Sequence, residues 1–159
     1  MRSFVFILTM SILGLVALTS VSFAQHSHGH GMGSGAMKME TREVLAEGVK
    51  VTFQIMANEE HKKMLKDMKM KEDVEAGTTH NITLTLKDEK TQREITDAQV
   101  SMKVIDPKGK DQIKDMRYEG AMKSFDAYVN LPDKGKYQVI VLVKRGDHKM
   151  PAGIYYEVK

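Results

Sequence analysis

Apolar and polar residues alternate along most of the chain after residue 44, and this period of two constrains the fold more than any other feature. Residues 49–55, for example, read VKVTFQI, with every odd position apolar. Such alternation is typical of a strand with one buried and one exposed face. The segments with this pattern predict seven strands: 49–55, 82–86, 98–104, 113–118, 125–131, 137–143 and 154–158.

One stretch, residues 57–77, interrupts the alternation. Asn58 can cap a helix, and His61, Met64, Leu65 and Met68 follow at the spacing i, i+3, i+4 and i+7 that gives a helix one apolar stripe. We therefore expect a short helix, inserted between the first two predicted strands, that packs over one end of the sheets.

Seven short strands with a single helix predict an all-β fold, a seven-stranded antiparallel immunoglobulin-like β-sandwich. Tyr137 follows the turn at residues 132–135 and begins the most apolar strand, where a tyrosine corner belongs; a plain core tyrosine is the alternative. The chain has no cysteine, so its stability must come from packing. The predicted core includes Val51, Phe53, Ile82, Leu84, Val100, Val104, Phe125, Val129, Tyr137, Val139 and Val141.

Residues 79–158 resemble the YtkA-like domains, which are relatives of FixH-type exported proteins. The resemblance is carried by a strand ending in Lys87-Asp88, by ITDAQV at 95–100, by VIDPKG at 104–109 and by the corner at 131–137. It implies an exported immunoglobulin-like domain, and several such domains sit near copper or respiratory-oxidase functions. It brings no catalytic motif that can be carried over.

The N-terminus has the pattern of a secretory signal peptide. One arginine precedes an apolar run of about fifteen residues, and Ser22-Phe23-Ala24 supplies small residues before a cleavage point. The run is shorter than the roughly 20 residues of a spanning helix, so a retained anchor is the weaker alternative. We expect a signal peptide at 1–24, a disordered His/Met/Gly-rich tail at 25–43 and the domain at 44–159, located in the periplasm or secreted without a stable membrane anchor.

Composition and motifs exclude several classes of function. The formal net charge is only +3, with acids and bases interspersed, so we expect no nucleic-acid partner. No nucleophile elbow, phosphate loop or cysteine nucleophile is present, and we expect no enzymatic activity.

Histidine and methionine are the residues that suggest a function. Two of the 13 methionines, Met1 and Met10, lie in the predicted signal peptide. The other eleven lie after it, as do all six histidines. Imidazole and thioether are ligands for copper where thiolates are absent. His148-Lys149-Met150 resembles the His-x-Met element of PCuAC-type periplasmic copper chaperones, although an ordinary solvated turn is the alternative.

The expected topology gathers the candidate ligands into two clusters. The helix-end cluster contains His61, Met64, Met68 and His80; for these residues, core packing and a rim histidine are the alternatives. The loop-end cluster joins the tail histidines to the turn residues and consists of His26, His28, His30, Met116, Met122, His148 and Met150. We favour the helix end, because ligands on a packed helix are better preorganised.

The sequence therefore predicts an exported metal-binding protein, a copper carrier or chaperone that uses His and Met ligands. Its expected partners are the metal ion and an envelope copper protein or respiratory-oxidase assembly factor. The alternative is a structural or protein-interaction module of the cell envelope that has no specific metal site.

The signal-peptide pattern gives the first testable prediction. The exported protein should begin at Gln25, because Ala24 is the last small residue of the cleavage pattern. Intact-mass measurement of exported material checks this, and a membrane-bound species that retains residues 1–24 would contradict it.

Overall fold

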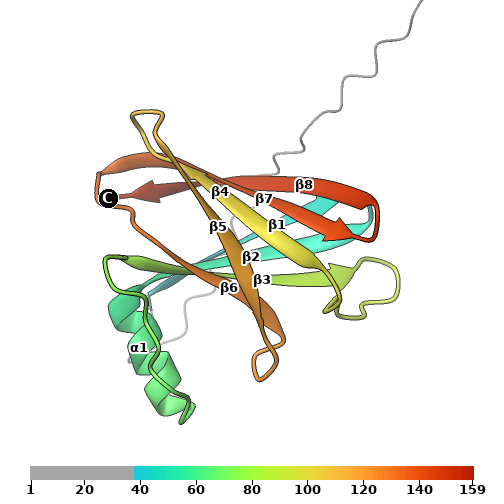
Figure 1. The fold of residues 1–159 in the computed structure, drawn as a ribbon, viewed down its shortest axis with the longest axis horizontal. Helices are drawn as coiled ribbons and strands as arrows, with labels where there is room; N and C mark the ends of the chain where they lie inside the picture. The colour runs from blue at the N-terminus through green and yellow to red at the C-terminus, as the bar shows by residue number, and fades with distance from the viewer. Residues whose placement is uncertain (1–37) are drawn as a thin grey trace, which may run out of the picture.

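The computed structural model describes residues 38–159; the predicted signal peptide and the part of the predicted tail up to residue 37, with His26, His28 and His30, lie outside the described residues. The described part contains eight strands and one helix (Figure 1). In chain order they are β1 (Met39–Ala46), β2 (Val49–Ala57), α1 (Asn58–Asp67), β3 (His80–Asp88), β4 (Gln99–Ile105), β5 (Asp111–Glu119), β6 (Ser124–Val129), β7 (Gly135–Arg145) and β8 (His148–Val158).

All eight strands belong to one antiparallel sheet with the order β1-β2-β3-β6-β5-β4-β7-β8. Strand β5 connects its two halves, because residues 111–116 pair with β4 while residues 117–119 pair with β6. In Figure 1 the half that contains β4, β7 and β8 lies across the half that contains β1, β2 and β3. Strands β1 and β8 contact each other at the remaining seam, so the sheet is nearly closed around the core.

The all-β class, the antiparallel pairing and the short helix are confirmed, but the structure has eight strands in one sheet instead of seven in a sandwich. The additional strand is β1, which starts at Met39, inside the segment 25–43 expected to lack structure. Only two residues of β1, Val44 and Ala46, belong to the core. Two alternating apolar residues are too short a pattern to predict a strand. A tight turn with positive φ at Glu47 and Gly48 connects β1 to β2.

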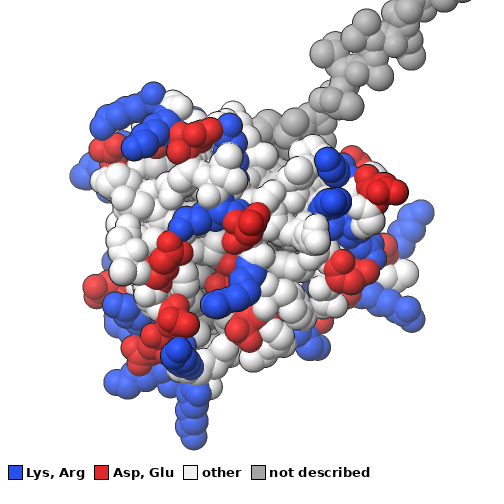
Figure 2. Space-filling view, viewed as in Figure 1, with Lys and Arg blue, Asp and Glu red and all other residues white. Residues whose placement is uncertain are grey.

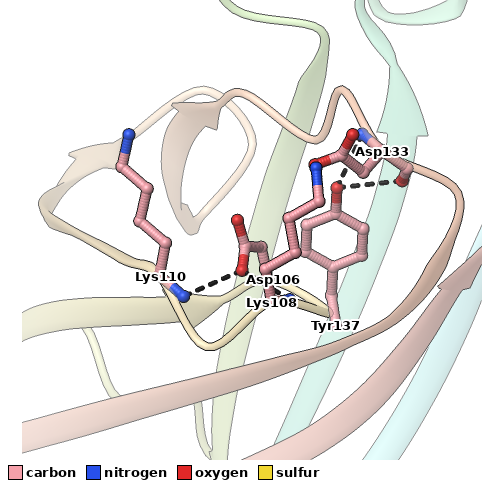
Figure 3. Close-up of polar contacts among 5 residues, drawn as sticks. All are labelled: Asp106, Lys108, Lys110, Asp133 and Tyr137. Carbon is pink, nitrogen blue, oxygen red and sulfur yellow. Dashed lines mark hydrogen bonds and ion pairs between the residues drawn. The ribbon is translucent and has the colours of Figure 1, made fainter.

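Every residue of the predicted core is buried, so the phases of the five predicted strands that supply it were read correctly. The tyrosine corner is also confirmed. The hydroxyl of Tyr137 donates to the carbonyl oxygen of Asp133 and accepts from the N–H of the same residue, both at 2.9 Å (Figure 3). Tyr137 is fully buried as well, so it closes the turn before β7 while its ring fills the core.

A second layer lies outside the sheet, where α1 covers β2, β3 and β6. Figure 1 shows α1 beyond these strands, on the side away from β4, β7 and β8. Leu65 of α1, Met56 of β2 and Tyr128 of β6 are buried but do not belong to the main core cluster. All residues of β6 are buried, because one phase faces the core and the other faces this outer layer.

The exposed surface mixes charges of both signs. Figure 2 shows lysine and arginine side chains interspersed with aspartate and glutamate on the face in view. Several form pairs, for example Lys103 with Asp111 at 2.7 Å. Within residues 38–159, no helix combines the length and the apolar character needed to cross a membrane.

The core packing predicts a large effect of truncating Phe53, which is fully buried in β2. Phe53→Ala should lower the free energy of unfolding by about 3–5 kcal/mol, because it removes a fully buried ring and leaves a cavity. Ile113→Ala is the control, since Ile113 is 67% exposed and its truncation should cost no more than about 0.5 kcal/mol. Denaturant unfolding measures both, and similar losses at the two positions would contradict the assigned phases.

Candidate metal site

Buried polar side chains gather in one place, between α1 and the outer face of β3 and β6. Among residues 38–159 the buried polar side chains are Asn58, His61, Asn81, Thr83, Ser124 and Asp126. The first two belong to α1, and the others alternate with core residues on β3 and β6, which places them on the outer face. This concentration is unusual, because buried polar groups need partners and are costly without them.

His61 is the central residue of this layer. Its side chain is 2% exposed, and Nδ1 lies 3.0 Å from the hydroxyl of Tyr128. The second ring nitrogen, Nε2, is buried without a hydrogen-bond partner. Burial lowers the pKa of His61, so the imidazole is neutral at pH 7 and one of its two nitrogens carries a lone pair instead of a proton. Such a lone pair on a fixed ring is the form of histidine that binds metal ions.

An open cavity of about 390 Å³ lies beside His61. Two thioethers line it together with His61: Met70, from the segment after α1, and Met122, from the turn between β5 and β6. Charged side chains line the rest of it; they are Lys71, Asp73, Arg117, Glu119 and Asp126. Two regions that are distant in the sequence, residues 61–70 and the turn that contains Met122, therefore bring one histidine and two methionines to the same cavity.

The charged side chains that line the cavity are three carboxylates and two cations. Asp126 is the most buried of them, and burial is the main cause that raises its pKa. Burial also raises the pKa of Tyr128 to about 12, so its hydroxyl stays protonated at any physiological pH.

Histidine and acidic side chains alone do not build a metal site in the part of the chain that the structure describes, because no three of them are suitably grouped. The additional donors that line this cavity include the side chains of Met70 and Met122. Thioethers are soft ligands, and they suit Cu(I) better than Zn(II) or Mg²⁺.

The structure divides the predicted helix-end cluster. Met64 is only partly buried, and Met68 is 48% exposed at the C-cap of α1, so neither lines the His61 cavity. Only His61 and Leu65 of the expected apolar stripe are buried. Helix α1 ends at Asp67, and the last residue of the expected stripe, Met68, is an exposed C-cap residue.

His80 lies on the other face of the sheet from His61. It pairs with Val129 in the register of β3 and β6 and is in phase with the core residue Ile82, whereas Tyr128 and His61 belong to the outer layer. The Nδ1 atom of His80 lies 2.8 Å from the hydroxyl of Thr79, and burial lowers its pKa. His80 is therefore a rim histidine, as the alternative expected, and does not share a site with His61.

Of the described members of the loop-end cluster, His148 and Met150 line one cavity of about 190 Å³, whereas Met116 and Met122 do not line it. Met116 and Met150 are core residues, at 7% and 3% exposure. His148 is exposed and its Nε2 lies 2.7 Å from a carboxylate oxygen of Glu47. Of this group only Met122 lines the His61 cavity.

The expectation of a turn around His148 was wrong because β8 begins there and continues through Pro151. Only Gly146 and Asp147 separate β7 from β8. Proline is tolerated in β8 because this strand lies at the edge of the sheet and needs no hydrogen-bond donor there.

Two residues of the cavity were not predicted, Met70 and Tyr128. Tyr128 lies out of phase with the core residues of β6, and a tyrosine on the supposedly exposed phase is a signal that something covers that face. Met70 carried no such signal, because it follows the end of α1 at a turn in which Lys69 has a φ of 55°.

Solved structures similar to this chain include two of FetP from uropathogenic Escherichia coli strain F11. The first is the as-isolated protein, expressed recombinantly in the periplasm of E. coli; the two share 11% identity with a TM-score of 0.54 over 78% of this chain and 97% of FetP. The second is a copper-bound FetP variant, with 12% identity and a TM-score of 0.52 over 77% of this chain and 97% of the variant.

At these identities the similarity establishes the fold and does not single out YtkA-like domains, so that resemblance stays a prediction. No protein-family model matches this chain. None of the curated proteins matches its sequence.

Burial of the two histidines predicts a pH dependence of stability. The folded pKa values of His61 and His80 lie below the ordinary value of 6.5, so the unfolded chain binds protons more readily. The free energy of unfolding should be fully retained above pH 6.5 and should fall as the pH drops below it, toward the folded pKa values.

Replacement by an uncharged side chain tests this dependence. Between pH 7 and pH 5 the double variant His61→Gln/His80→Gln should lose less stability than the parent protein, measured by urea unfolding. Equal losses in the two proteins would contradict the assignment.

Proposed function

We propose that this protein is an exported copper carrier that binds one Cu(I) ion in the cavity beside His61. The ligands are Nε2 of His61 and the thioether sulfurs of Met70 and Met122. The observation that carries the proposal is that His61, whose Nε2 is buried without a hydrogen-bond partner, lines one cavity together with Met70 and Met122.

The cost of that unpartnered nitrogen supports a ligand role. Leaving a buried polar atom without a hydrogen bond costs about 1–3 kcal/mol, and such atoms in folded proteins call for an explanation. A bound metal ion supplies the missing partner. Neutral thioethers complete the coordination without adding charge, and they tolerate an oxidising compartment where thiolates are lost.

The compartment and the fold agree with this function. The signal-peptide pattern of residues 1–24 directs the chain out of the cytoplasm, and the fold is similar to that of FetP, one structure of which contains copper. The cavity opens to solvent and its ligands come from a helix, a loop and a turn, which permits an ion to enter and leave. These properties suit a carrier that passes copper to an envelope protein, and they do not call for enzymatic activity.

A second candidate function is a protein-interaction module of the envelope. Ile113 on β5 is 67% exposed and Leu142 on β7 is 38% exposed, and both belong to the outward phases of the half of the sheet that α1 does not cover. Exposed large apolar side chains on a sheet face favour a contact with another protein.

Anaerobic Cu(I) titration against a competing chelator tests the proposed function. The parent protein is the chain with His26, His28 and His30 replaced by Asn, so that these three histidines do not contribute. It should bind one Cu(I). The affinity of His61→Gln and of Met70→Leu/Met122→Leu should be lower by about 100-fold or more, because losing even an outer partner of a metal ligand costs roughly 10- to 100-fold.

The matched control is Met64→Leu/Met68→Leu, which removes the same number of thioethers from positions outside the cavity. It should bind Cu(I) as the parent does. Equal losses of Cu(I) affinity in the two double methionine variants, or no Cu(I) binding by the parent, would contradict the proposed site. The second outcome would favour the interaction module.

A further inference from the structure

Tyr128 stands behind His61, on the side opposite its unpartnered nitrogen. Its hydroxyl lies 3.0 Å from Nδ1 of His61, and the two ring centroids are 5.5 Å apart. Tyr128 is 7% exposed and lines the same cavity. Its backbone is held in β6, which pairs with β3 on one side and β5 on the other, and Tyr128 itself pairs with Asn81 of β3. The hydroxyl is therefore fixed by the sheet, whereas His61 belongs to a helix on its surface.

The contact between the two residues allows two arrangements of protons. If the tyrosine O–H donates to Nδ1, the imidazole proton sits on Nε2, and a buried N–H has no acceptor. If the N–H of Nδ1 donates to the tyrosine oxygen, Nε2 carries a lone pair and the unpartnered atom is an acceptor, while the tyrosine O–H can turn to the open cavity that Tyr128 lines. Unpaired buried N–H groups are rarer than underused acceptors, which favours the second arrangement.

We propose that Tyr128 is a positioning residue: its phenol oxygen accepts the proton of Nδ1 and thereby keeps Nε2 of His61 free to bind Cu(I). The part of this inference that concerns copper rests on the proposed function, whereas the proton arrangement of the metal-free protein does not. Outer partners of this kind fix the tautomer and orientation of a metal-binding histidine.

The assignment explains why a tyrosine is buried on the outer phase of β6. A phenylalanine would fill the same space beneath α1, but it would leave Nδ1 without a partner. With Tyr128 in place, one nitrogen of His61 is satisfied by the protein and the other is left for the ligand. The lone pair is thus preorganised before the ion arrives.

The test uses Tyr128→Phe in the full chain with His26, His28 and His30 replaced by Asn, and the same chain with Tyr128 as the parent. Nitrogen-15 NMR of the metal-free proteins above neutral pH reports which nitrogen of His61 is protonated, and the His61→Gln variant identifies its signals. Anaerobic Cu(I) titration measures affinity. Tyr118→Phe is the matched control, because the Tyr118 ring packs against Phe125 and does not line the cavity.

We expect the proton of His61 on Nδ1 in the parent and in Tyr118→Phe. In Tyr128→Phe it should move to Nε2, the nitrogen that carries it in free histidine, and the Cu(I) affinity should fall by roughly 10- to 100-fold. A purely structural role would leave the tautomer unchanged.

Two results would overturn the assignment: a parent protein with the proton already on Nε2, or a Tyr128→Phe variant that binds Cu(I) as tightly as the parent. The first needs no variant, so it remains decisive even if Tyr128→Phe folds poorly. Failure of the proposed function is a different result, in which the parent itself binds no Cu(I) although its His61 carries the proton on Nδ1.

Discussion

The burial of β6 on both faces is the constraint on which the rest of the structure depends. All residues of this strand, Ser124–Val129, are buried. One phase supplies Phe125, Ala127 and Val129 to the core, while the other lies in the layer beneath α1. Strand β6 also pairs with β3 and with β5, the strand that connects the two halves of the sheet. The core and the candidate site are therefore opposite faces of one strand, and neither can shift without moving the other.

The two faces differ in chemistry. The inner face is apolar and closely packed, and it stabilises the fold without a disulfide. The outer layer holds every buried polar side chain of residues 38–159, and four of its atoms lack a partner: Asn58 Oδ1, His61 Nε2, Asn81 Nδ2 and Ser124 Oγ. Natural proteins break the rule of polar satisfaction mainly at functional or strained sites, and the unpartnered Nε2 of His61 agrees with the site proposed there.

The candidate site could be predicted only in part. His61 and Met122 were both identified as candidate ligands, but in separate clusters, because an assumed sandwich topology set their neighbours. Met70 and Tyr128 were missed. Met116 and Met150 were predicted as candidate ligands, but both are core residues. The sequence does not distinguish a methionine that packs in the core from one that lines a cavity. The composition of the site depends on which segments lie next to one another in space. Strand β5 determines this, because it pairs with β4 through residues 111–116 and with β6 through residues 117–119.

The sequence by itself determined the all-β class, the phases of the five strands that supply the predicted core, the position of the helix and the tyrosine corner at Tyr137. These follow from interactions between residues near one another in the chain or from the period of burial, and both can be read locally. Only the tertiary structure decided that the strands form one nearly closed sheet, that His61 and His80 lie on opposite faces and that Met70, Met122 and Tyr128 meet at His61. Those contacts join residues up to 67 positions apart, as between His61 and Tyr128, and depend on strand order, which no local pattern encodes.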